Sequence, residues 1–273
     1  MKNRFLTFAA CALVPSVLFF TACEEKKKEK AASSDQADGL EQKVQKLLSE
    51  MTIEEKVGQM TQVNLNMILS NGYGPPGDSI QMDTLRKVLK EKNIGSFLNC
   101  IDHAYTVEKW HEIITKIQDV ATKETRLKIP VIYGIDAIHG VTFTRDATLF
   151  PHNLALAAGR NPELVQKAES ITAKETRASG IRWNFDPVVD VGRQPLWSRF
   201  GETFGEDVFI TKVMGVATIK GQQGDNVNTP STVAACMKHY LGYSAPQSGK
   251  DRSPSIIPET VLREIFCPLS VRQ

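Results

Sequence analysis

Residues 161–187, NPELVQKAESITAKETRASGIRWNFDP, contain the helix-to-strand unit that decides the fold. Asn161 is a suitable N-cap and Pro162 suits the first helical position, so a helix is expected to begin here and to end before Gly180. The apolar and aromatic run 181–185 predicts a short strand. The Asp-Pro pair behind it ends the strand, because proline has no N–H to donate to a sheet.

Helices and strands alternate on both sides of this unit. Apolar residues at helical spacing predict helices over residues 40–51, 53–60, 85–89, 110–120, 209–223 and 258–266. Short apolar runs predict strands over residues 94–98, 129–135, 154–157 and 233–238. Residues 71–77, NGYGPPG, predict a turn-rich loop. Strands that alternate with helices in this way form parallel βαβ units.

Polar residues directly follow several of the predicted strands. Asp136 follows VIYGI, Asp186 follows IRWNF, and Lys238 and His239 follow VAACM. Functional side chains at the carboxyl ends of parallel strands favour an α/β fold of the (β/α)8 TIM-barrel-like type, with a doubly wound sheet as the alternative. The chain has no GxGxxG and no P-loop motif, which argues against a nucleotide-binding version of that sheet.

The connection that follows the strand at 181–185 carries charges of both signs beside Trp197. Arginines and carboxylates bind hydroxyl groups, and an indole can cover the apolar face of a sugar ring. We therefore interpret this connection as part of a pocket for a neutral ligand with many hydroxyls. A solvated loop with surface salt bridges is the alternative. The charged residues are Asp190, Arg193, Arg199, Glu202, Glu206 and Asp207.

The composition is that of an ordinary globular protein. The 273 residues are 41% hydrophobic and 23% charged, with a formal net charge of +2. This length suits one large domain or two small ones. No basic stripe occurs, so nucleic acid is not an expected partner. No CxxC or HExxH motif occurs either, so we expect no metal and no cofactor.

The N-terminus has the pattern of a secretory signal. Two basic residues precede an apolar run over residues 5–20, and Thr-Ala-Cys follows, which resembles a bacterial lipoprotein box. We therefore expect residues 1–22 to be a signal peptide and Cys23 to be lipidated. An uncleaved membrane anchor is the alternative, but the apolar run is short for a span.

Residues 23–38 are charged and small and show no apolar periodicity, so we expect a disordered tether. Residues 39–273 would then form the folded domain. The expected location is the periplasm or the outer membrane and cell surface, with the lipid anchor as the membrane contact.

Four phrases of the chain resemble the N-terminal barrel of family 3 glycoside hydrolases, β-glucosidase branch. They are IPVIYGIDAIHG, TLFPHNLALAAGRNPEL, RQPLWSRFGETFGED and KHYLGY, and they occur in the family's order. The resemblance covers roughly residues 40–266. It implies a retaining exo-β-glucosidase that hydrolyses terminal non-reducing β-D-glucosyl residues, with a β-glucoside or oligosaccharide as substrate.

The resemblance also implies a set of substrate-binding residues. Asp136 matches the aspartate that accepts hydrogen bonds from ring hydroxyls. Arg199 matches the last arginine of the family's RWGR pattern, although the Leu and Ser of LWSR depart from it. Lys238 and His239 match the lysine and histidine that hold hydroxyls on the other side of the ring.

We expect other roles for residues that lie near these positions in the sequence. We expect His139 to pack or cap rather than to touch substrate, and Glu202 and Glu206 to support Arg199. The branch of the family that cleaves N-acetylglucosaminides carries a histidine soon after the Lys-His pair. Residues 241–244 here are Leu-Gly-Tyr-Ser, which favours a glucosidase or a related exo-acting enzyme.

The resemblance implies catalytic carboxylates that this sequence does not show. Retaining glycosidases use two carboxyl groups about 5 Å apart. The family's nucleophile lies in an SDW-like phrase and its acid/base lies in a second domain, yet no Asp here precedes a Trp. We therefore expect a barrel that is incomplete at the C-terminus and holds only the sugar-binding half of the site. A non-catalytic extracytoplasmic sugar-binding lipoprotein is the alternative.

Overall fold

The computed structural model describes residues 39–70, 79–100 and 103–267. Packing divides the chain into two units, Met1–Thr52 and Ile53–Gln273. In the first unit, residues 39–50 form a single helix, as the apolar spacing predicts. The predicted signal peptide with Cys23, the tether and the loop at 71–77 lie outside the described residues.

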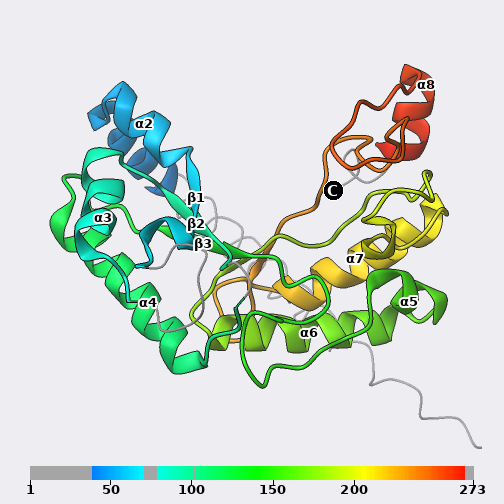
Figure 1. Ribbon diagram of the computed structural model, residues 1–273, viewed down its shortest axis with the longest axis horizontal. Coiled ribbons are helices and arrows are strands. Elements are labelled where there is room, and N and C mark those ends of the chain that lie inside the picture. Colours follow the sequence, from blue (N-terminus) through cyan, green and yellow to red (C-terminus); the bar gives the residue numbers. More distant parts are fainter. Residues whose placement is uncertain (1–38, 71–78, 101–102, 268–273) are drawn as a thin grey trace, which may run out of the picture. The chain divides into compact units, whose positions relative to one another are not determined.

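The second unit is built on a sheet of five parallel strands in the order β1-β2-β3-β4-β5 (Figure 1). Each strand pairs with the next one along the chain, as expected for consecutive βαβ units. The strands are β1 Gln62–Asn64, β2 Ser96–Leu98, β3 Ile132–Ile135, β4 Trp183–Asn184 and β5 Ala234–Ala235. The register places Phe97 opposite Tyr133 and Ile135 opposite Asn184.

The helices of this unit other than α5 begin and end close to the predicted positions. They are α2 Ile53–Gln59, α3 Met82–Arg86 with η2 Lys87–Glu91, α4 Val107–Asp119 with η3 Val120–Glu124, α5 Asn153–Ala158, α6 Pro162–Ala178, α7 Val208–Gln223, and α8 Glu259–Val261 with η5 Leu262–Phe266. Two short 3-10 turns, η1 Leu65–Ile68 and η4 Phe200–Glu202, complete the set. The predicted cap of α6 is confirmed, because the Asn161 side chain accepts a 2.8 Å hydrogen bond from the Leu164 backbone N–H.

One apolar core lies between the first three strands and the helices that follow them. Phe97 and Tyr133 stack on one face of the sheet, and Trp110 of α4 meets the Tyr133 ring edge-on with centroids 5.6 Å apart. The buried Trp110 indole donates a 3.0 Å hydrogen bond to the Phe143 carbonyl. A tryptophan can be buried in a core without an energetic penalty for its indole N–H when that group donates a hydrogen bond, as it does here.

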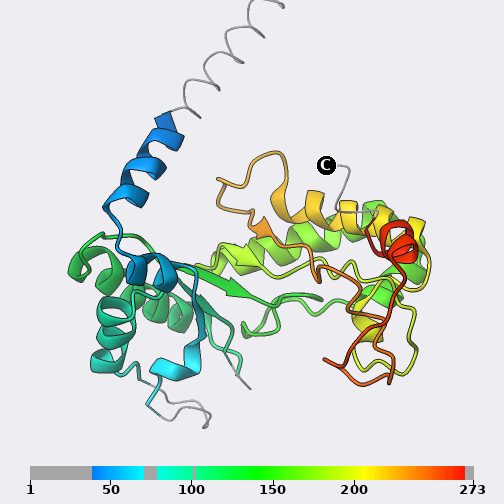
Figure 2. The ribbon, with the colours of Figure 1, turned by 90° about the horizontal axis from the view of Figure 1, so that it is seen from above.

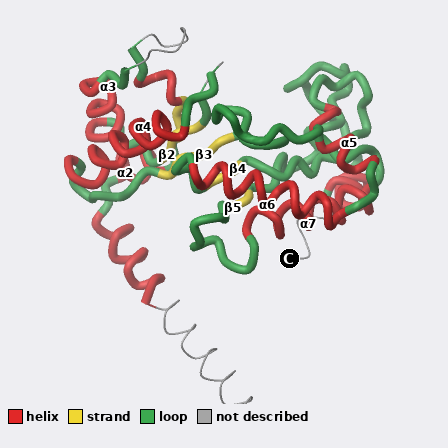
Figure 3. Tube along the Cα trace, turned by 90° about the horizontal axis from the view of Figure 1, so that it is seen from below, coloured by secondary structure: helices red, strands yellow, loops and turns green. Residues whose placement is uncertain are grey.

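A second, smaller core joins α5, α6 and α7. It contains Ala157, Val165, Met214 and Ala217, together with Phe204 from the segment before α7. The two long helices α6 and α7 run alongside each other over much of their length (Figure 2, Figure 3). Among the described residues, none of the helices is both long enough and apolar enough to cross a membrane.

Two sequence-based expectations about the strands are wrong. Residues 154–157 were expected to be a strand but belong to helix α5. A four-residue apolar run has no readable period, so length and flanking residues alone must decide between helix and strand. The strand β1 was not expected, because only three residues, Gln-Val-Asn, take part in its ladder.

Candidate functional site

Asp136 lies directly after β3 and is held in place from two sides. The Asn99 side-chain amide donates a 2.6 Å hydrogen bond to one oxygen of the Asp136 carboxylate, and its carbonyl accepts a 2.8 Å bond from the Asp136 backbone N–H. The Lys238 ammonium donates to the other carboxylate oxygen. The Asp136 side chain remains 33% exposed, so this fixed carboxylate can still meet a ligand.

Asn99 was not anticipated from the sequence, yet it follows the same rule as the predicted residues. It comes directly after β2, just as Asp136 comes directly after β3. Carboxyl ends of neighbouring parallel strands lie at one edge of a sheet, so polar residues there are close in space. Applied to the strand at 94–98, this rule would have found Asn99.

His239 follows Lys238 and is oriented by Asp190. The Asp190 carboxylate, which is buried, lies 2.6 Å from the His239 Nδ1 and accepts a 3.0 Å bond from the His239 backbone N–H. The opposite ring nitrogen, Nε2, is 3.3 Å from Arg199 Nη1. Because a guanidinium only donates, Nε2 must accept and Nδ1 must carry the hydrogen that goes to Asp190.

Arg199 is fixed by Glu202 in a two-bond fork. Its Nε and Nη2 donate to the two carboxylate oxygens of Glu202 over 2.9 and 2.7 Å. These bonds are the main reason why the pKa of Arg199 lies above its ordinary value. Asn153 at the start of α5 donates to the Glu202 backbone carbonyl over 2.9 Å, which ties this turn to the helix. The prediction that Glu202 supports Arg199 is confirmed, whereas Glu206 is exposed and takes no part in this fork.

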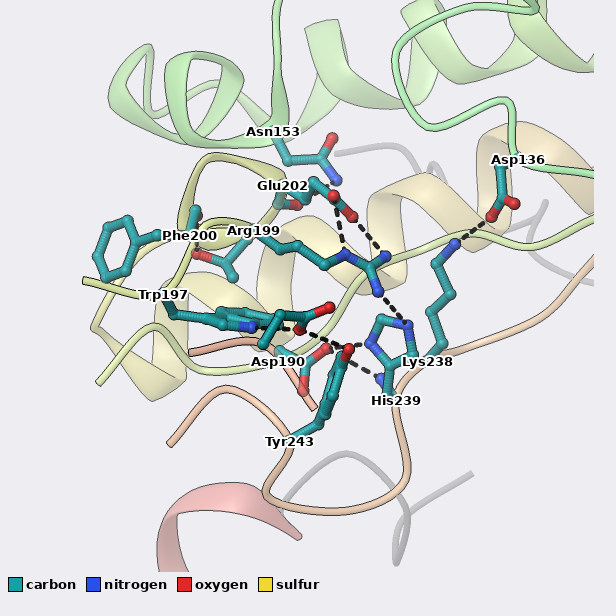
Figure 4. A network of polar contacts seen from close by, with 12 residues as sticks. Asp136, Asn153, Asp190, Trp197, Arg199, Phe200, Glu202, Lys238, His239 and Tyr243 are labelled. Carbon is teal, nitrogen blue, oxygen red and sulfur yellow. Dashed lines mark hydrogen bonds and ion pairs between the residues drawn. The ribbon is translucent and has the colours of Figure 1, made fainter. Parts of the chain in front are cut away.

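The four predicted substrate-binding residues therefore lie in two hydrogen-bonded groups, Asp136 with Lys238 and His239 with Arg199, which the Lys238–His239 peptide bond joins (Figure 4). The two groups together are called the network below. Asp136, Lys238, His239 and Arg199 come from three different connections after β3, β4 and β5. The cations of the network face carboxylates, so it does not concentrate charge of one sign. Such a mixture of donors and acceptors suits a neutral ligand with hydroxyl groups.

Trp197 does not lie where the sequence suggested. Its side chain is buried, with 2% exposure, so it cannot cover the face of a sugar ring. Its indole N–H donates a 2.8 Å hydrogen bond to Asp251. The aromatic side chain beside the network is that of half-buried Tyr243, whose ring centroid is 4.6 Å from that of His239.

Other residues singled out in the sequence have different surroundings. Arg193 is exposed, and Asp207 caps α7 through a 2.7 Å bond from the Ile210 N–H. His139 packs against the ring of His152, with centroids 4.4 Å apart, and burial together with that neighbour lowers the pKa of His139.

Asp186 follows β4 but is fully buried and turned toward the helices. Gln222 of α7 donates to Asp186 over 2.7 Å and to Glu169 of α6 over 2.9 Å. Burial raises the pKa of Asp186 to about 7, and it raises the pKa of Glu169 well above its ordinary value. Burial disfavours the charged carboxylates, and the nearness of Asp186 raises the pKa of Glu169 further, whereas the Gln222 amide acts in the opposite direction on both pKa values. Across the described part of the chain, no three His, Cys, Asp or Glu side chains gather to hold a metal ion.

Residues 52–269 match the family model described as the glycosyl hydrolase family 3 N-terminal domain. The chain belongs to glycoside hydrolase family 3, a family of enzymes whose N-terminal domain is a TIM-barrel-like α/β fold. The parallel sheet, with polar side chains after its strands, is the corresponding part of that fold.

The similar proteins include β-glucosidases, β-xylosidases and a β-glucanase. The lysosomal β-glucosidase of Dictyostelium discoideum is 44% identical over 82% of this chain and 28% of its own length. The periplasmic β-glucosidase of Salmonella typhimurium is 31% identical over 75% of this chain and 24% of its own length. The chain thus spans about a quarter of the length of these relatives.

The solved structures that are similar to this chain include a β-glucanase and a β-glucosidase. The exo-1,3/1,4-β-glucanase of a Pseudoalteromonas species superposes with a TM-score of 0.72 at 32% identity, over 85% of this chain and 28% of the glucanase. The β-glucosidase of Listeria innocua in complex with glucose superposes with a TM-score of 0.70 at 29% identity, over 84% of this chain and 30% of the glucosidase.

Proposed function

We propose that the network around Asp136 binds the terminal non-reducing β-D-glucosyl residue of a β-glucoside or oligosaccharide. The observation that carries this proposal is that two partly exposed hydrogen-bonded groups, Asp136 with Lys238 and His239 with Arg199, meet at the adjacent residues Lys238 and His239. The β-glucosidase names of the relatives, and the glucose bound by the Listeria innocua enzyme, support glucose as the sugar.

Hydrogen-bonding capacity in the network remains for a ligand. The carboxylate oxygens of Asp136 each have a second acceptor site, and the Lys238 ammonium has two further hydrogens. A sugar hydroxyl can donate a hydrogen bond to the Asp136 carboxylate and accept one from the Lys238 ammonium at the same time. Because Asn99 and Lys238 already fix the carboxylate, little side-chain entropy is lost when the sugar binds.

The reaction we propose is retaining β-glucoside hydrolysis, with this chain supplying the sugar-binding half of the site. The carboxylates of the network are already engaged, Glu202 with Arg199 and Asp190 with His239. A nucleophile must be free to attack the anomeric carbon, and an acid/base must reach the leaving oxygen. We therefore propose that both reacting carboxylates lie outside these 273 residues.

We also propose that the protein works outside the cytoplasm, anchored through a lipid on Cys23. The periplasmic relative and the lipoprotein-like Thr-Ala-Cys phrase support this location. In the alternative function, a sugar-binding lipoprotein without catalysis, the same network would bind the same sugar.

The test combines an assay of hydrolysis with a titration. The full chain, at high concentration, should show no turnover of 4-nitrophenyl β-D-glucoside but should bind D-glucose. Asp136→Ala should weaken that binding at least about tenfold, since a hydrogen bond to a charged group is worth about 1.5–3 kcal/mol. The matched control Asp225→Asn, on an exposed loop, should bind as the wild type does. Turnover that disappears in Glu202→Gln or Asp186→Asn would instead show that a carboxylate of this chain is the nucleophile.

A further inference from the structure

Asp251 joins two segments that approach the network from different strands. Its Oδ1 accepts a 2.8 Å hydrogen bond from the Trp197 indole N–H and a 2.6 Å bond from the Tyr243 hydroxyl. Trp197 lies on the connection after β4, and Tyr243 and Asp251 lie on the connection after β5. A single carboxylate oxygen thus holds two aromatic side chains together.

Tyr243 also contacts two residues of the network, His239 and Arg199. Its ring meets the Trp197 ring at 82° and the His239 ring at 63°, with centroids 5.2 and 4.6 Å apart. The Arg199 guanidinium carbon lies 5.7 Å from the centre of the same Tyr243 ring, within the range of a cation–π contact. The orientation of Tyr243 therefore restricts where His239 and Arg199 can lie (Figure 4).

Further contacts show that the segment 243–253 is built to lie against the segment 191–199. The buried Ser244 hydroxyl donates a 2.6 Å bond to the Val191 carbonyl, and the Gln194 amide donates a 3.3 Å bond to the Pro246 carbonyl. Gly249 has a φ of +75°, and a Cβ there would lie 2.7 Å from the Cβ of Leu196. A larger residue at position 249 would push the two segments apart.

We propose that Asp251 is a positioning residue for sugar binding, which acts through Tyr243 on His239 and Arg199 without touching the sugar. The proposal deepens the function proposed for the network and rests on it. Oδ1 of Asp251 accepts two hydrogen bonds, and the Asp251 side chain is 28% exposed. The two hydrogen bonds also hold the pKa of Asp251 below its ordinary value, with the Tyr243 bond as the larger cause.

The proposed role predicts different outcomes for two substitutions of Asp251. Asp251→Asn keeps a carbonyl oxygen that can accept both hydrogen bonds, whereas Asp251→Leu keeps the volume and removes the acceptor. Lys250→Gln, one residue away and exposed, is the matched control. Tyr243→Phe keeps the ring but removes the hydroxyl, and provides a second variant if Asp251→Leu does not fold.

Two readouts on the full chain test the proposal. The first is the dissociation constant for D-glucose, which should rise at least tenfold in Asp251→Leu and less than threefold in Asp251→Asn and Lys250→Gln. In Tyr243→Phe the dissociation constant should rise between threefold and tenfold. Equal glucose binding by Asp251→Leu and the wild type, or an equal loss in Asp251→Asn and Asp251→Leu, would overturn the proposal.

The second readout needs no ligand, so it separates this proposal from the function on which it rests. The NMR signals of the Trp197 indole N–H and of the His239 ring should both shift in Asp251→Leu, while Asp251→Asn and Lys250→Gln should keep them near the wild-type positions. If the Trp197 signal moves and that of His239 does not, Asp251 does not position the network. If both signals move but the wild type does not bind D-glucose, the positioning is upheld and the proposed function fails.

Discussion

Raising the pH should destabilise this protein through the buried carboxyl pair of Asp186 and Glu169. Both side chains are fully buried, and both accept a hydrogen bond from Gln222. An unfolded aspartate ionises near pH 4, whereas burial keeps Asp186 protonated up to about pH 7. Between these values the folded state binds more protons than the unfolded state, so the free energy of unfolding falls as the pH rises.

The size of the effect follows from the pKa of Asp186. A change from 3.8 to about 7 corresponds to about 4 kcal/mol, at about 1.4 kcal/mol for each pH unit. Roughly 3 kcal/mol of this stability should be lost between pH 5 and pH 8. Glu169 adds to the loss in the same direction, because its pKa is raised as well.

Urea unfolding of the full chain at pH 5 and pH 8 measures this loss. The double variant Asp186→Asn with Glu169→Gln replaces both acids by neutral amides, so its free energy of unfolding should change little between the two pH values. Asp225→Asn, on an exposed loop, should keep the wild-type dependence. A wild-type free energy of unfolding that is constant or rises from pH 5 to pH 8 would show that the folded protein does not keep these two carboxyl groups protonated.

Three other substitutions test the site, the fold and the anchor separately. Asn99→Leu removes the two bonds that Asn99 makes to Asp136 and should weaken D-glucose binding about tenfold in a calorimetric titration; unchanged binding would show that the Lys238 bond alone suffices to hold Asp136. Gly140→Ala should lower the melting temperature by several degrees in a calorimetric scan, because φ is +90° and a Cβ would lie 2.0 Å from the Thr148 carbonyl oxygen; a melting temperature like that of the wild type would contradict this close approach. Cys23→Ser should move the protein from the membrane fraction to the soluble fraction on fractionation, and identical fractionation of both forms would exclude the lipid anchor.

Much of the site could be predicted from the sequence because parallel strands bring their carboxyl ends to one edge. Asp136, Lys238 and His239 each closely follow a strand, so their proximity depends only on the order of the strands. Asn99 obeys the same rule, since it directly follows the strand predicted at 94–98. Arg199 lies farther from its strand, and its place came from the family resemblance.

The features that the sequence did not reveal depend on distant partners. Trp197 looked suited to cover a sugar, but its burial depends on Asp251, 54 residues away, and nothing local signals that contact. The run LALA at 154–157 is equally compatible with helix and strand until the second core selects the helix. The burial of Asp186 likewise depends on Gln222, which reaches it from α7.

The decisive experiment on glucosyl binding by the network around Asp136 is a crystal structure of the protein with D-glucose. One ring is expected, with hydroxyls within about 3 Å of the Asp136 carboxylate and the Lys238 ammonium and with Arg199 and His239 beside it. Glucose bound elsewhere on the protein, or a network that stays empty while D-glucose binds in solution, would show that the network is not the glucose site.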